Sequence, residues 1–122
     1  MPNCDSYITR IMTEAPDIKR CAIVSYNDGE LWYSATGDTA IQSTEDELSV
    51  LLDAFAAIEF PATMMLEGAS YKVSRVDGRW AIRGRREGGG FCAVRGNMAV
   101  LIAVFEGEEA IGKVYNTLKN TE

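Results

Sequence analysis

The sequence has no histidine, and it has only three cysteines and three prolines among its 122 residues. Without histidine, general-base catalysis by an imidazole is excluded. The cysteines are odd in number, and their unrelated spacings fit neither a disulfide framework nor a zinc site. There is no signal peptide and no apolar run of the roughly 18 residues that a membrane helix needs. We therefore expect a cytosolic protein.

Positive charge is also scarce. The chain carries 12 lysines and arginines against 18 acidic residues, a formal net charge of −6. This balance argues against general nucleic-acid or membrane binding. Hydrophobic residues make up 47% of the chain, which is ordinary for a soluble globular protein. Without an internal repeat or linker, we expect a single domain over residues 1–122.

Residues 71–105 contain four strand-like runs joined by short turns. An Asp-Gly pair is a strong hairpin signal, and successive tight turns predict an antiparallel meander. The expected turns are Asp77-Gly78, Gly88 to Gly90 and Gly96-Asn97. The expected strands are 71–76, 79–84, 91–95 and 98–105. The last of these is eight apolar residues without alternation, which predicts a central strand covered on both faces. A helix is the competing interpretation of residues 98–105, but the β-branched and aromatic residues in this run favour a strand.

Helices are predicted on both sides of this meander. Residues 3–13 place an apolar stripe on one helical face, with Asn3 as a possible cap and Ala15-Pro16-Asp17 as the end. Residues 44–58 begin with a capping box formed by Thr44 and Glu47. Strands are expected at 21–26 and 31–35, joined by a turn at Asp28-Gly29, and a last short helix is expected around Ile111 to Leu118. This order predicts an α+β fold, with a central antiparallel sheet, the N- and C-terminal helices on one face and the capped helix on the other.

Basic residues gather at Arg83, Arg85, Arg86 and Arg95. Strand alternation puts Arg83 and Arg85 on one sheet face and Arg86 on the other. A solvated strand edge is the simplest explanation for any one of them, yet their bunching on an acidic protein favours an anionic partner. The run Gly84 to Gly90 lacks the Gly-Lys-Ser/Thr of a phosphate loop and is predicted to be a flexible hairpin connection. No constellation of acids, bases or nucleophiles specifies catalysis.

Three motifs, in this order and spacing, resemble the profilin family. They are Tyr71-Lys72-Val73, the run from Ala81 to Gly90, and the run from Asn97 to Phe105. Ala22-Ile23-Val24, Asp28-Gly29, Leu31-Trp32 and Leu66-Glu67-Gly68 support the match, which spans nearly the whole chain. The resemblance implies a protein that binds monomeric actin, promotes its nucleotide exchange, and binds proline-rich peptides and often phosphoinositides. It also implies no enzymatic activity and no cofactor.

The resemblance assigns residues to three surfaces. The actin surface matches Phe60, Arg75, Arg83, Arg85, Gly112, Lys113 and Tyr115. The proline-peptide groove matches Cys4, Tyr7 and Trp32. The third surface is the basic cluster of Arg83, Arg85, Arg86 and Arg95, which is expected to attract phosphoinositide headgroups as in many profilins. Cys4 stands where the family usually has tryptophan, and the last helix looks shortened, without its usual late tyrosine. This divergent pattern predicts weak or shifted proline-rich binding and a better preserved actin surface. The net charge of −6 predicts that phosphoinositide binding is weak and salt-sensitive.

A different class of function fits the same layering. A small α+β scaffold or sensory domain of the longin or light-chain type would bind a protein partner other than actin. The run Ile82-Arg83-Gly84-Arg85 discriminates between the two hypotheses, because such a scaffold has no reason to carry it on a central strand. The leading hypothesis is therefore a monomeric, cytoskeleton-associated protein that regulates actin polymerisation.

Overall fold

The computed structural model describes residues 4–26, 31–34, 41, 43–57, 59–76, 80–96, 99–107 and 111–121. The elements follow one another as α1 (Cys4–Glu14), β1 (Ile18–Ser25), β2 (Leu31–Ser34), α2 (Glu45–Ala56), β3 (Thr63–Leu66), β4 (Ala69–Val76), β5 (Ala81–Arg86), β6 (Gly89–Arg95), β7 (Ala99–Glu106) and α3 (Ile111–Thr121). The turns expected at Asp28-Gly29 and Asp77-Gly78 lie outside these residues, as do Asn3, Ala35, Ile58, Asn97 and Met98.

The strands form one antiparallel sheet in the order β2-β1-β7-β6-β5-β4-β3. The central position predicted for the last apolar strand is confirmed, since β7 lies between β1 and β6 and its residues from Val100 to Phe105 are all buried. Ala103 pairs with Cys21 on one side and Cys92 on the other. This strand has no solvent-facing side, which explains why its sequence does not alternate.

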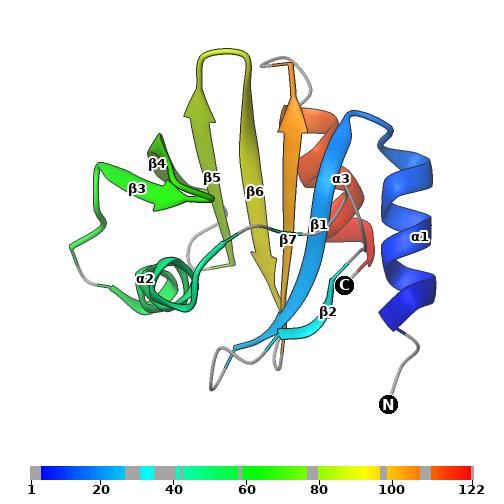
Figure 1. The fold of residues 1–122 in the computed structure, drawn as a ribbon, viewed down its shortest axis with the longest axis horizontal. Helices are drawn as coiled ribbons and strands as arrows, with labels where there is room; N and C mark the ends of the chain where they lie inside the picture. The colour runs from blue at the N-terminus through cyan, green and yellow to red at the C-terminus, as the bar shows by residue number, and fades with distance from the viewer. Residues whose placement is uncertain are drawn as a thin grey trace.

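A separate apolar core covers each face of the sheet. On one face, α1 and α3 pack through Ile8, Ile11, Val114 and Leu118 against alternate residues of the strands. On the other face, α2 packs through its buried leucines and Phe55. Figure 1 shows α2 and α3 on opposite sides of the sheet. The predicted layering, with the terminal helices sharing one face, is therefore confirmed.

Local chemistry explains where α2 begins. The Thr44 hydroxyl accepts a hydrogen bond from the Glu47 backbone N–H at 3.2 Å, and the Glu47 carboxylate accepts one from the Thr44 N–H at 2.9 Å. The predicted capping box is thus confirmed. The helix is shorter than the expected 44–58, because it ends at Ala56 and Ala57 already has extended backbone angles.

Several strands are longer than predicted. The strand expected at 79–84 is β5, which continues through Arg86, and the reversal that follows it is the pair Glu87-Gly88, with Gly88 at φ 81°. Gly89 and Gly90 belong to β6, so the prediction of a flexible connection over Gly84 to Gly90 was wrong. β1 begins at Ile18 rather than at residue 21. β3 is an edge strand that was not predicted, because residues 64–66 were expected to be a connection that leads into the sheet.

Candidate functional site

Four polar side chains share one face of the sheet across β4 and β5. Arg83 pairs with Ser74, and Arg85 pairs with Lys72. Arg83 is half-buried and the other three are exposed. The Arg83 Nε donates a hydrogen bond to the Ser74 Oγ at 3.4 Å. We call these four residues the basic face. It brings together two of the arginines predicted for the actin surface.

The basic face remains uncovered because the nearest helix packs elsewhere. It lies on the same side of the sheet as α1 and α3, since Ala81, two residues before Arg83, belongs to the core beneath these helices. α3 packs on β6 and β7, leaving the outer part of β5 open. Alternation continues the face onto β3, where Thr63 pairs with Lys72. Met65, on the same side of β3, is 47% exposed and adds an apolar contact point.

Arg75 belongs to the opposite face of the sheet. It pairs with Ile82, which lies in the core beneath α2. The Arg75 Nη2 donates hydrogen bonds to the backbone oxygens of Ala54, at 3.2 Å, and Ala57, at 2.6 Å. Its guanidinium carbon lies 4.7 Å from the centre of the Phe60 ring. The structure therefore brings Arg75 and Phe60 together, away from Arg83 and Arg85.

The four arginines predicted for phosphoinositide binding do not form one patch. Arg86 lies on the face opposite Arg83 and Arg85, as predicted from alternation, with its guanidinium 5.6 Å from the centre of the Tyr71 ring. Arg95 is at the far end of β6, 3.7 Å from the centre of the Tyr26 ring and 5.1 Å from that of Trp80. Only Arg83 and Arg85 are neighbours on a common face.

The candidate residues on α3 differ in exposure. Gly112 and Lys113 are exposed at the start of the helix, and a Cβ added at Gly112 would meet nothing within 4 Å. Tyr115 is half-buried against the core beneath α1 and α3, with the Lys119 Nζ 5.8 Å from the centre of its ring. The helix runs to Thr121, further than the end expected soon after Leu118.

The residues predicted for the proline-peptide groove come from neighbouring elements. Cys4 and Tyr7 lie on α1, and Trp32 lies on β2. α1 packs against α3 and also contacts β2, so α1 connects the elements that carry these residues. The side chains of the three residues are outside the described part of the structure, and the groove itself stays a prediction.

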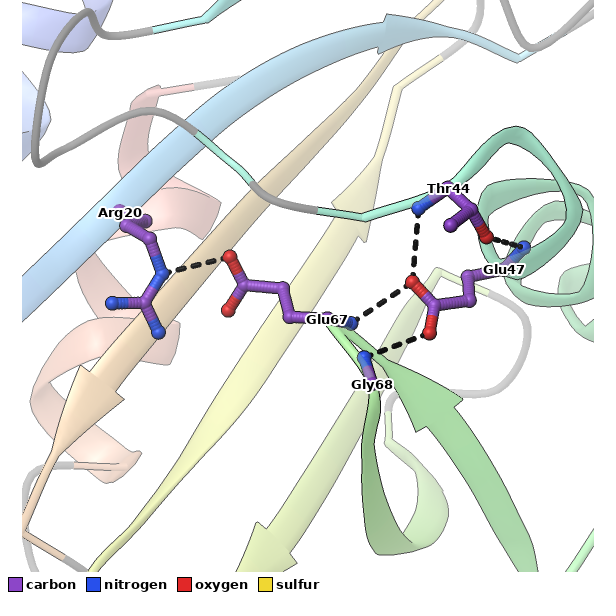
Figure 2. A network of polar contacts seen from close by, with 5 residues as sticks. All are labelled: Arg20, Thr44, Glu47, Glu67 and Gly68. Carbon is purple, nitrogen blue, oxygen red and sulfur yellow. Dashed lines mark hydrogen bonds and ion pairs between the residues drawn. The ribbon is translucent and has the colours of Figure 1, made fainter.

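A polar network connects α2 to the turn between β3 and β4 (Figure 2). Besides capping α2, the Glu47 carboxylate accepts hydrogen bonds from the backbone N–H groups of Glu67, at 3.0 Å, and Gly68, at 2.9 Å. Glu67 has a left-handed φ of 55°, and its carboxylate accepts a 2.7 Å hydrogen bond from the Arg20 Nε. These contacts fix the Leu66-Glu67-Gly68 motif between α2 and β1.

The network also affects titration. Burial alone would raise the pKa of Glu47, but the hydrogen bonds from Thr44, Gly68 and Glu67 outweigh this effect and hold the pKa below its ordinary value. The hydrogen bond to Glu67 raises the pKa of Arg20. The network therefore stabilises charged groups in a structural role, because both carboxylates are directed at protein donors.

No reactive or metal-binding cluster is found among the described residues. Cys21 and Cys92 are buried free thiols, and burial raises the pKa of each to about 12, so neither is a nucleophile near neutral pH. The described residues include no group of three cysteines, aspartates or glutamates that is placed to hold a metal ion. None of the described helices is long and apolar enough to cross a membrane.

Comparison with known proteins decides the family. The Profilin family model matches residues 3–122. Profilin-1 of Caenorhabditis elegans is 37% identical over 113 residues, covering 91% of this chain and 85% of that protein. The chain belongs to the profilin family.

Solved profilin structures share the fold. Acanthamoeba castellanii profilin IB superposes with a TM-score of 0.79 at 21% identity, over 94% of this chain and 90% of that one. LokiProfilin2, solved in complex with rabbit actin, gives 0.74 at 12% identity, over 98% and 96%. Mouse profilin IIa, solved with a double repeat from the FH1 domain of mDia1, gives 0.65 at 20% identity, over 98% and 96%.

Sequence reasoning missed three residues of the exposed surface of this profilin. Lys72 and Ser74 were predicted to lie in a strand but were given no functional role, and Met65 was not predicted to lie in a strand. Alternation carried a usable signal for the first two. A two-residue turn at Asp77-Gly78 would pair Arg83 with Lys72, whereas the observed register pairs it with Ser74. The expected and the observed register differ from each other by an even number of residues. In both of them, Lys72 therefore lies on the same face of the sheet as Arg83.

Proposed function

We propose that this profilin binds monomeric actin through the basic face and thereby regulates actin polymerisation and nucleotide exchange. One observation supports the choice of surface. A protein of net charge −6 leaves Lys72, Arg83 and Arg85 together on an uncovered part of the sheet, beside the exposed side chain of Met65. Clustered cations around an apolar contact fit a partner whose surface is acidic, as that of actin is in general.

The α3 residues extend this proposed surface. Gly112 and Lys113 are exposed, and the open space beside Gly112 would let a partner approach the helix backbone closely. Tyr115 would contribute from its half-buried position. Phe60 would add an apolar contact at the edge of the sheet near β3. Arg75 is left out of the proposed contacts, because its guanidinium is directed at α2 and Phe60.

Adjacent arginines on β5 provide a matched test. Arg85→Glu and Arg86→Glu change the net charge equally, but only Arg85 belongs to the basic face. We expect Arg85→Glu to weaken actin binding by about 2 kcal/mol or more if its ion pair is buried in the complex, and less at a rim. Arg86→Glu should weaken it far less. The measurements are the affinity for monomeric actin and the inhibition of pyrene-actin polymerisation.

Thermal unfolding of both variants provides the control. Because Arg85 is exposed, its reversal should change the melting temperature little. Equal effects of the two reversals on actin affinity would remove the basic face from the interface. Failure of the unmodified protein to bind actin would favour the alternative function, a scaffold domain that binds another protein.

We also propose weak binding of proline-rich peptides by residues of α1, α3 and β2. The mouse relative was solved with an FH1 repeat. The family resemblance matches Tyr7 and Trp32 to the proline-peptide groove, and it puts Cys4 where profilins usually have tryptophan. Loss of a large flat aromatic removes contact area and a ring donor. We expect a dissociation constant in the high-micromolar to millimolar range, which corresponds to roughly 4–6 kcal/mol.

Fluorescence of Trp32 during a decaproline titration measures this affinity. Trp80 is 49% exposed and must be replaced by phenylalanine so that it does not contribute to the signal. A saturating change with a low-micromolar midpoint would show that the groove is fully functional without the missing indole.

The remaining parts of the proposal follow from family membership. We expect a monomeric cytoplasmic protein that associates with the actin cytoskeleton and acts by binding rather than by catalysis, without a cofactor.

A further inference from the structure

The C-terminus of α2 is closed by a residue from the sheet. The last turn of this helix contains no basic residue of its own, and its final carbonyl groups carry the negative end of the helix dipole. The Arg75 Nη2 reaches the Ala54 and Ala57 oxygens at 3.2 Å and 2.6 Å. The two hydrogens on this one nitrogen are enough to satisfy both acceptors.

The same guanidinium also holds Phe60. Its carbon atom lies 4.7 Å from the ring centre, within the range of a cation–π contact. Phe60 is half-buried on the core beneath α2, only three residues after Ala57. Arg75 therefore ties the end of the helix and the aromatic ring to one rigid strand.

The backbone brings the two residues together. The Val73 N–H donates a 3.0 Å hydrogen bond to the Ala62 oxygen, which extends the ladder between β3 and β4 by one step beyond the Thr63–Lys72 pair. Chain direction then carries Phe60 alongside Arg75. This segment follows the edge of the sheet that also carries Met65, next to the basic face.

From this geometry we infer that Arg75 is a positioning residue for actin binding, which orients Phe60 at the edge of the interface and makes no ion pair with actin. The inference rests on the proposed actin function. The opposite assignment, a direct charge contact, requires Arg75 to leave two backbone acceptors and an aromatic ring.

A double-mutant cycle with a salt series tests the inference. The variants are Phe60→Ala, Arg75→Met, both together, Arg75→Lys, and Arg85→Met as the matched removal of a cation from the basic face. Arg75→Met should weaken actin binding about as much as Phe60→Ala, of the order of tenfold for a truncated interface aromatic. The double variant should be no weaker than Phe60→Ala, because the two changes remove the same contact.

Salt dependence separates positioning from charge contact. Arg85→Met should make actin affinity less sensitive to salt, whereas Arg75→Met should leave that sensitivity unchanged. Arg75→Lys keeps a cation over the ring but lacks the planar fork, so it should recover part of the lost affinity. In the free protein, Arg75→Met should also accelerate hydrogen exchange of the Val73 amide, which reports the position of residues 60–62.

The outcomes are distinguishable. Multiplicative losses in the double variant, or a reduced salt dependence in Arg75→Met, would make Arg75 a contact residue and overturn the inference while the proposed function stands. No effect of Phe60→Ala would overturn it in the same way. If the unmodified protein does not bind actin, the proposed function and this inference both fail.

Discussion

Glu47 shows how one carboxylate can join two segments of a chain that are distant in sequence. It accepts backbone hydrogen bonds at the start of α2 and at the turn between β3 and β4, through both of its oxygens (Figure 2). We predict that Glu47→Gln lowers the free energy of unfolding by about 1 kcal/mol at neutral pH. The amide keeps one acceptor but directs an NH₂ donor at a backbone N–H. Urea denaturation measures the change.

The effect of Glu47→Gln should depend on pH. The pKa of Glu47 is lower in the folded protein than its ordinary value. The carboxylate therefore contributes stability above the unfolded pKa, and this contribution is lost as the pH falls through the folded pKa. The variant and the unmodified protein should then converge in stability under acid conditions. Asp46→Asn, an exposed neighbour in the first turn, should cost only a few tenths of a kcal/mol. A difference that persists in acid would contradict the assigned role.

The sequence predicts part of this residue's role. The spacing of Thr44 and Glu47 identifies a capping box, because the two residues are three positions apart at the start of the same helix. The bonds to Glu67 and Gly68 join positions 20 and 21 residues apart, which no local pattern reveals. The role of Arg75 cannot be predicted from a local sequence pattern either. Its sequence neighbours mark a strand, but its partners belong to the end of a helix that the prediction placed two residues too late.

At the scale of the elements, the β5–β6 hairpin depends closely on side-chain volume. A Cβ added to Gly90 would lie 2.9 Å from the Phe105 Cζ and press on the Gly84 backbone oxygen. Neither atom can yield easily, because both belong to paired strands beneath a packed core. We predict that Gly90→Ala destabilises the protein by about 1–3 kcal/mol, as overpacking does elsewhere. Chemical denaturation provides the measurement.

Gly112→Ala is the matched control. Its added Cβ meets no atom within 4 Å and lies in a helix, so stability should stay within about 0.5 kcal/mol or rise slightly. If both substitutions had the same effect, close packing in the hairpin could not be the cause. This packing also explains the wrong prediction for Gly84 to Gly90. A run of glycines is typical of a loop, but here Gly84 and Gly90 are small because Phe91 and Phe105 occupy the space above them.

The layering of the elements was predictable, because each one carries its own apolar pattern. The stripe of α2 and the continuous apolar run of β7 each indicate how many faces must be buried, and together they determine a covered sheet. β3 was missed for the converse reason. It is a four-residue edge strand with alternating burial, and so short a pattern does not stand out from a connecting segment.

At the scale of the whole molecule, the distribution of charge matters more than the count. The sequence places four arginines close together in the chain, which led to the prediction of one anionic-lipid site. Folding assigns Arg86 to the other face of the sheet and places Arg95 close to Tyr26 and Trp80 at the far end of β6. Register and tertiary packing, rather than composition, therefore determine how many cations a flat anionic surface can meet at once.

The separation of the arginines onto different parts of the sheet predicts how strongly the protein binds membranes that contain phosphoinositides. Each cation near an anionic surface contributes only about 1 kcal/mol, and Lys72, Arg83 and Arg85 are the basic residues that the sheet presents together. The net charge of −6 opposes approach. We expect sedimentation with phosphoinositide vesicles to be weak at low salt and lost at physiological salt. Arg85→Gln should reduce the low-salt binding more than Arg95→Gln, although both remove one charge. Equal losses, or tight binding at physiological salt, would mean that vesicles are recognised by a surface other than the basic face.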